Sequence, residues 1–164
     1  FKECIHEPKG NRLVFEGIVQ PGCGPIFHVH LCQAEGFEVR QGTMAYQVRG
    51  HPVQYLAAGD KTVFEQAVPH RFWNAGDTEL IMNSWAKPAG NLRRYMTILF
   101  LSTSKRHSNT PALFDAAYLT IQYKGEFDVL EIPYLVKSLL FPAVYWIGRA
   151  FRVYKKYELK KSDE

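Results

Sequence analysis

His28 and His30 are separated by a single residue, and Glu35 follows five positions after the second histidine. Successive side chains of a strand point to opposite faces, so a strand through this stretch turns both imidazoles to the same side. A neighbouring strand that begins near Glu35 can aim its carboxylate at the same point. Two imidazoles and a carboxylate form half of an octahedron, a donor set that suits iron, manganese, nickel, cobalt or zinc and leaves positions for water, oxygen or substrate. The pattern therefore predicts a metal site built on strands.

A second stretch, which contains a third histidine, makes the pattern more specific. Together the two stretches resemble the paired sequence motifs of the cupin superfamily. Every fixed position of the first motif is matched, by Gly22, His28, His30, Glu35 and Gly42. The second motif is matched by Gly59, Asp60, His70 and Asn74. Its Pro-x-Gly element is missing, because residues 65–67 read Glu-Gln-Ala instead. The resemblance covers residues 12 to 88.

This resemblance implies a mainly β fold, a cupin-type jelly-roll barrel that holds one divalent transition metal (Fe, Mn, Ni, Co or Zn). The implied ligands are His28, His30, Glu35 and His70. Glu38 is a rival carboxylate, but it lies three residues beyond Glu35 and on the opposite face of the strand. We therefore assign the carboxylate of the site to Glu35, which either binds the metal or swings off to act as a catalytic base. A lone histidine is usually a surface or hydrogen-bonded residue, whereas four donors in the order of the family favour the metal site.

The middle of the chain is divided into short apolar or alternating segments by turn residues. These segments predict strands at Phe37–Gln41, Met44–Arg49, Val53–Leu56, Thr62–Phe64, Val68–Trp73 and Glu79–Trp85. Closely spaced strands of this kind favour a sandwich or a barrel. A closed barrel gives the histidine and glutamate side chains a common interior in which to meet.

After Pro88 the apolar period changes from that of a strand to that of a helix. A first helix is expected over residues 92–100, a polar loop over 102–109 and a second helix over 111–121. A third, more apolar segment begins at Pro133, and Pro142 is expected to kink or divide it. We therefore expect a barrel of residues 1–88 and a helical extension of about three α-helices, residues 89–164, packed on the barrel.

Charge is concentrated at the C-terminal end of the chain. Residues 137–164 carry seven lysines and arginines against three acids, which accounts for the whole net charge of +4. The rest of the chain is balanced, so no basic face marks the barrel as a nucleic-acid binder, and no nucleic acid is expected as a partner.

Residues 134–157 have an apolar body with basic and aromatic flanks, which fits peripheral contact with a membrane surface. The charge-free run from Ser138 to Gly148 is eleven residues, well short of the ~20 that a spanning helix needs. The alternative is that this helix caps the barrel or forms a contact in a homodimer while its basic end is solvated. The sequence leaves both interpretations open.

The 164 residues are the size of one domain, and 46% hydrophobic content is enough to bury a core. Three cysteines (Cys4, Cys23 and Cys32) are odd in number and lack C-x-x-C spacing, so a reducing, cytoplasmic location is expected. For Cys32 we expect a small, buried apolar side chain. Because Phe1 is not an initiator methionine, the numbering is expected to begin within a longer or processed chain.

The function expected from these features is that of a metal-dependent cupin enzyme acting on a small, apolar or aromatic organic molecule. The chemistry would be of the oxygenase, isomerase, decarboxylase or cyclase type. The substrate pocket is predicted to be lined by Phe27, Phe37, Phe72 and Trp73. Two alternatives stay open: a non-catalytic small-molecule-binding protein, and a metal-independent isomerase or cyclase that uses the same pocket.

Overall fold

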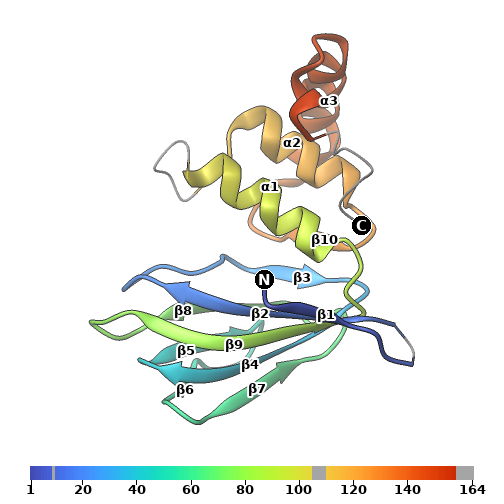
Figure 1. Ribbon diagram of the computed structural model, residues 1–164. Coiled ribbons are helices and arrows are strands. Elements are labelled where there is room, and N and C mark those ends of the chain that lie inside the picture. Colours follow the sequence, from blue (N-terminus) through green and yellow to red (C-terminus); the bar gives the residue numbers. More distant parts are fainter. Residues whose placement is uncertain (9, 105–109, 158–164) are drawn as a thin grey trace. The chain divides into compact units, whose positions relative to one another are not determined.

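The computed structural model describes residues 1–8, 10–104 and 110–157 of the chain (Figure 1). Two antiparallel five-stranded sheets, with strand orders β1-β2-β9-β4-β7 and β10-β3-β8-β5-β6, dominate the structure. The strands are β1 (Glu3–Ile5), β2 (Arg12–Val19), β3 (His28–His30), β4 (Ala34–Gln41), β5 (Met44–Val48), β6 (Gln54–Leu56), β7 (Lys61–Phe64), β8 (His70–Asn74), β9 (Leu80–Lys87) and β10 (Phe127–Val129). This is the double-sheet arrangement of a jelly roll, so the predicted mainly β fold is confirmed.

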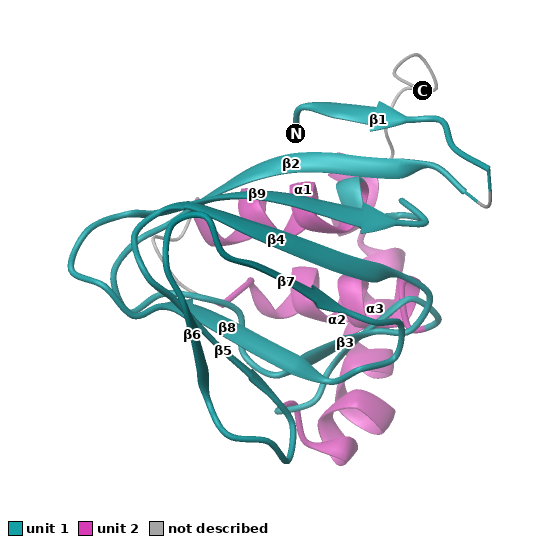
Figure 2. Cartoon of the chain, turned by 90° about the horizontal axis from the view of Figure 1, so that it is seen from below, with its two compact units in different colours: residues 1–93, 125–131 teal, residues 94–124, 132–164 magenta. Residues whose placement is uncertain are grey.

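The chain forms two compact units, coloured separately in Figure 2. Unit 1, which contains the two sheets, comprises Phe1–Arg93 and Gly125–Glu131; unit 2 comprises Arg94–Lys124 and Ile132–Glu164. The division expected at residue 88 therefore differs from the observed one, because β10 returns from the helical region to pair with β3. That the helical extension packs on the barrel stays a prediction.

The core of unit 1 forms because the strands alternate. In β9, for example, Leu80, Met82, Ser84 and Ala86 are buried while the residues between them are half-buried. The main apolar cluster consists of Phe37, Val39, Met44, Phe64, Phe72, Leu80 and Met82.

Two residues that match the sequence motifs fix the backbone at the ends of strands. Gly42 has φ +84° and a Cβ there would lie 2.9 Å from a backbone oxygen. Asn74 donates to the carbonyls of Val19 (2.8 Å) and Thr78 (2.7 Å).

Unit 2 is helical and matches the expected order of helices. It contains most of α1 (Leu92–Ser104), then α2 (Leu113–Gln122), the π-helix η1 (Val136–Leu140), α3 (Phe141–Ala150) and the 3₁₀-helix η2 (Val153–Tyr157). The loop expected from residue 102 begins later, because α1 continues to Ser104; residues 105–109 of that prediction lie outside the described residues.

The third helical segment changes from π to α at Phe141, beside Pro142, where a division was expected. Proline is tolerated in the first turn of an α-helix because the missing N–H has no intrahelical partner there. Across the part of the chain that the structure describes, every helix falls short of the length and apolarity needed to cross a membrane.

A buried carboxylate stabilises unit 2. Asp115, at the start of α2, accepts a hydrogen bond from Lys156 Nζ at 2.7 Å. Burial alone would raise the pKa of Asp115, but hydrogen bonds from Lys156, Ser102 and Tyr157 lower it on balance. Because the pKa is lower in the folded than in the unfolded chain, the stability that Asp115 contributes is present above the unfolded pKa and is lost as the pH falls through the folded one.

We therefore expect the melting temperature of unit 2 to decline between about pH 5 and pH 2, and the Asp115→Asn variant to show a shallower decline from a lower starting value. Thermal melts followed by far-UV circular dichroism, which reports helix, measure this dependence. Parallel pH profiles for the two proteins would show that Asp115 does not cause the loss of stability at low pH.

Candidate metal centre

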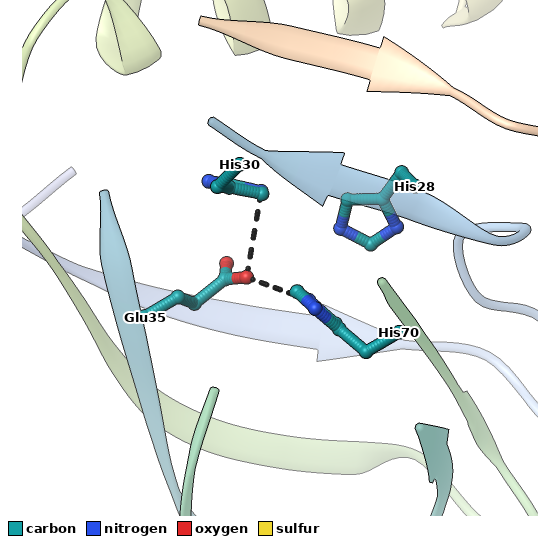
Figure 3. A group of neighbouring side chains, drawn as sticks. All are labelled: His28, His30, Glu35 and His70. Carbon is teal, nitrogen blue, oxygen red and sulfur yellow. Dashed lines mark hydrogen bonds and ion pairs between the residues drawn. The ribbon is translucent and has the colours of Figure 1, made fainter. Parts of the chain in front are cut away.

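Three histidines of one sheet and a glutamate of the other meet between the two sheets of unit 1 (Figure 3). His28 and His30 extend from β3, and the pairing of β3 with β8 places His70 directly opposite His28. Glu35 extends from β4 in the other sheet. Figure 3 shows the four side chains pointing toward one another. The strand periodicity predicted from the sequence therefore produces the convergence that a metal site requires.

The site is compact and shielded from water. One ligating atom from each of the four side chains lies within 4.8 Å of all the others. Glu35 Oε2 is 3.1 Å from His70 Nε2 and 3.5 Å from His30 Nε2. His30, Glu35 and His70 are buried, and His28 is half-buried.

Backbone carbonyls fix the orientation of two of the imidazoles. Nδ1 of His28 lies 2.9 Å from the carbonyl oxygen of Ile26, and Nδ1 of His70 lies 2.9 Å from that of Val68. A carbonyl can only accept, so Nδ1 carries the proton in both rings and Nε2 is left as the site-facing nitrogen. Metal-binding histidines are commonly held by such a second hydrogen bond.

The site favours neutral imidazoles beside an ionised carboxylate. Burial, together with the neighbouring charge of His70, lowers the pKa of His28 to about 4. Burial also lowers the pKa of His30, although Glu35 opposes this effect. For Glu35, burial would raise the pKa, but the charge of His30 and the hydrogen bond with His70 lower it on balance. At neutral pH His28 and His30 are therefore neutral imidazoles and Glu35 is an ionised carboxylate.

The hydrogen-bond partners of His70 and His30 indicate whether the site fits a metal ion. His70 Nδ1 faces the Val68 carbonyl and its Nε2 lies 3.1 Å from a Glu35 carboxylate oxygen, so a single ring proton cannot serve both contacts. Two acceptors at that distance repel each other unless a cation or a proton lies between them. Within the described part of the chain, His30 Nδ1 is also buried without a hydrogen-bond partner. A nitrogen-rich set with one carboxylate fits the first-row divalent metals.

Two aromatic rings that the sequence analysis did not identify position the histidines. The ring of Phe64 stacks on His70 with centroids 3.9 Å apart and an angle of 10°. The ring of Phe127 meets His30 edge-on at 5.2 Å. Phe64 is the register partner of Glu35, so a strand alignment of β4 with β7 would have identified it. Phe127 lies on β10, inside a region read as helical, and only the short alternating run at residues 127–129 could have indicated it.

The predicted pocket residues separate into two pairs. Phe37 and Phe72 lie in the apolar cluster of the barrel interior, with their rings 4.9 Å apart. Phe27 and Trp73 instead lie against the guanidinium of Arg71, at 4.7 and 5.1 Å. Residues 71 and 73 alternate with His70 and Phe72 along β8, so Trp73 projects from the opposite face of the strand. The structure therefore brings only Phe37 and Phe72 to the face that carries the metal cluster.

The competing residues lie away from the cluster. Glu38 lies near Arg40 (3.7 Å) and Lys61 (3.5 Å), whereas Glu35 points inward to the histidines. Cys32, expected to be buried, is exposed and donates to the carbonyl of Gly125 at 3.3 Å; it is a free thiol, as are Cys4 and Cys23.

The turn before β8 shows how the chain manages without the Pro-x-Gly element. Ala67, which stands where the family motif has glycine, has a left-handed φ of +60°. The turn is closed by Val68 N–H donating to Glu65 O at 3.2 Å, and Ala67 N–H donates to His30 O at 2.8 Å. The loop that presents His70 is therefore retained, at the cost of backbone strain at an alanine.

Replacing Ala67 with glycine should relieve this strain and stabilise unit 1 by about 1 kcal/mol, because glycine alone adopts positive φ without steric cost. Urea unfolding measures the difference. An Ala67→Gly variant less stable than the parent protein would contradict the geometry of this turn.

Comparison with known proteins agrees with this geometry. Residues 15–85 match the sequence profile described as the cupin domain. The probable oxidoreductase virH of Hypocrea virens is 25% identical over 159 aligned residues, which cover 88% of this chain and 69% of that protein.

Two solved structures are also similar. One is a double-stranded β-helix protein of Klebsiella pneumoniae, with 23% identity and TM-score 0.46 over 55% of this chain and 77% of that one. The other is a cupin-like protein of Thermotoga maritima, with 27% identity and TM-score 0.45 over 48% of this chain and 58% of that one.

Proposed function

Because the barrel of this chain belongs to the cupin superfamily, we propose that the protein is a metal-dependent enzyme acting on a small organic molecule. The observation that carries the proposal is the convergence of His28, His30, Glu35 and His70 with their ligating atoms within 4.8 Å. A divalent transition metal held by these residues would supply Lewis acidity or redox chemistry.

The protonation states of the histidines and of Glu35 suit them to different roles. The lowered pKa values of His28 and His30 keep these imidazoles neutral, so they serve as ligands rather than as acids. Glu35 is ionised at neutral pH because its pKa is also lowered. Its carboxylate can bind the metal, or accept the proton of a substrate hydroxyl or enol that enters the site.

The surroundings of the site favour an apolar or aromatic substrate. Phe64 stacks on His70 and Phe127 meets His30 edge-on, so the rings in contact with these histidines are apolar. Such a lining offers few polar groups to a charged or sugar-like molecule. Among oxygenase, isomerase, decarboxylase and cyclase chemistry, we favour an oxidation, because a relative of 25% identity is named a probable oxidoreductase.

The proposal is tested by loading the protein anaerobically with Fe²⁺ and following oxygen consumption with a panel of phenolic and enolic compounds, with product analysis by mass spectrometry. Substrate-dependent oxygen uptake that is lost in Glu35→Gln supports the oxidase or oxygenase assignment. Conversion without oxygen uptake would move the assignment to isomerase, decarboxylase or cyclase chemistry. Stoichiometric metal with ligand binding and no conversion would contradict the enzyme and favour a binding protein.

A further inference from the structure

Unit 2 carries an apolar helix face that is open to solvent. Leu135, Leu139, Trp146 and Phe151 are 67%, 66%, 65% and 79% exposed. Leu135, Leu139 and Trp146 are spaced four and seven residues apart, so they form one stripe along η1 and α3, and Phe151 directly follows the end of α3. The opposite face of α3, with Phe141, Val144, Tyr145 and Gly148, is the one buried in unit 2. The stripe is therefore additional to the core of this unit.

The exposed stripe ends at a cluster of positive charges. Residues 132–157 contain five cations and no carboxylate. Lys137 lies in η1, whereas Arg149, Arg152, Lys155 and Lys156 lie at and beyond the C-terminal end of α3, where Lys156 is paired with Asp115. Three of these line a hollow of about 250 Å³ beside the C-terminal end of α3, together with Tyr154. A hollow bordered by three cations suits a phosphate group, because each cation attracts the negative charge and can donate hydrogen bonds to phosphate oxygens.

Arg152 occupies a position where helices usually have glycine. It follows the end of α3 with φ +57°, and its N–H donates to the carbonyl of Arg149 at 3.1 Å. A non-glycine residue in this left-handed conformation is strained. An arginine at this point gives the hollow a third positive charge that glycine would not provide.

We propose that this surface, which consists of the stripe of Leu135, Leu139 and Trp146, of Phe151 after the end of α3, and of the adjoining cationic hollow, docks on an anionic phospholipid bilayer. The stripe would lie in the boundary between head groups and acyl chains, where tryptophan is favoured. The hollow would receive a lipid phosphate, with attraction from the negative surface potential of the bilayer. A second copy of the chain fits less well, because residues 132–157 contain no carboxylate that could pair with the cations of the hollow across an isologous contact.

The first test is sedimentation with phosphatidylcholine–phosphatidylserine vesicles and with phosphatidylcholine vesicles. The protein should sediment with the anionic vesicles, and its tryptophan emission should shift to the blue. The Trp146→Ser/Phe151→Ser variant should partition roughly 100-fold more weakly, because two large apolar side chains no longer leave water. The matched control is Ile18→Ser/Tyr55→Ser on unit 1, since these residues are also exposed (58% and 65%); its partitioning should be unchanged.

The second test concerns charge. The Arg152→Gly/Lys155→Gln variant should partition onto the anionic vesicles roughly 30-fold more weakly, because it lacks two cations that would lie near the anionic surface. The control, Arg40→Gln/Arg49→Gln, removes the same charge from unit 1 and should differ little from the parent protein. Arg152→Gly alone should bind more weakly while melting at the same or a higher temperature, so a folding defect would not explain the loss.

Four results would overturn the proposal, the last of them for the cationic hollow. The first is a failure of the parent protein to sediment with anionic vesicles. The second is equal loss of partitioning in the unit 2 variants and their unit 1 controls. The third is a dimer that Trp146→Ser/Phe151→Ser dissociates while vesicles are not bound, which would assign the stripe to a contact between copies. Displacement by inorganic phosphate beyond the effect of ionic strength would assign the hollow to a soluble anion instead.

Discussion

The His28→Ala/His70→Ala variant is expected to bind Co²⁺ more than about 100-fold more weakly than the parent protein. Changes that remove only a hydrogen-bond partner of a metal ligand already lower the metal affinity by about 10- to 100-fold, and this variant removes two of the four donors. In the parent protein no proton competes for His28 at neutral pH, because burial and the charge of His70 lower its pKa to about 4. Titration of the visible absorption of Co²⁺ measures both affinities.

The control for this experiment is His51→Ala. His51 is exposed at the turn after β5, outside the cluster, so its loss should leave Co²⁺ affinity unchanged. Circular dichroism of the double variant checks that the sheets persist, as expected from the largely apolar core. Unchanged Co²⁺ affinity in a folded double variant would remove His28 and His70 from the ligand set.

The Phe37→Ala variant is expected to lower the free energy of unfolding of unit 1 by about 3–5 kcal/mol. Phe37 is 3% exposed, and its ring lies 4.9 Å from Phe72 and 5.9 Å from Phe64. Deleting the ring removes buried apolar surface and leaves a cavity next to the residue that stacks on His70. Urea unfolding, followed by circular dichroism, measures the loss.

Tyr55→Ala provides the matched control, because Tyr55 is an aromatic residue of the same unit that is 65% exposed. Its replacement should change the stability by no more than about 0.5 kcal/mol. A small effect of Phe37→Ala, comparable with that of Tyr55→Ala, would show that Phe37 lines an open pocket rather than packing in the core.

The alternation of side chains made much of the site predictable. His28 and His30 share a strand face, and motif spacing brought Glu35 and His70 into the same prediction; the structure brings all four together. Turn residues such as Gly42 also separated the central strands near their observed limits. Alternation and turns depend on local sequence, so a single chain was enough to infer them, whereas His70 joined the prediction only through the resemblance to the cupin motifs.

Other features depend on contacts between distant residues. The pairing of β10 with β3 brings Phe127 to His30 across nearly a hundred residues of chain, and a three-residue strand has too little periodicity to be recognised. Trp73 was predicted to line the pocket because it is aromatic. It lies against Arg71 instead, because the register of β8 turns it to the face of the strand opposite His70. Register, rather than residue type, decides such cases.

The central claim is that His28, His30, Glu35 and His70 together hold one divalent metal ion. The most direct test is elemental mass spectrometry of the protein purified without a histidine tag or chelator and then loaded with excess metal and desalted. Our account predicts one divalent transition-metal ion per chain in the parent protein and a loss of that ion in His28→Ala/His70→Ala. Parent protein that retains no metal after loading would contradict it.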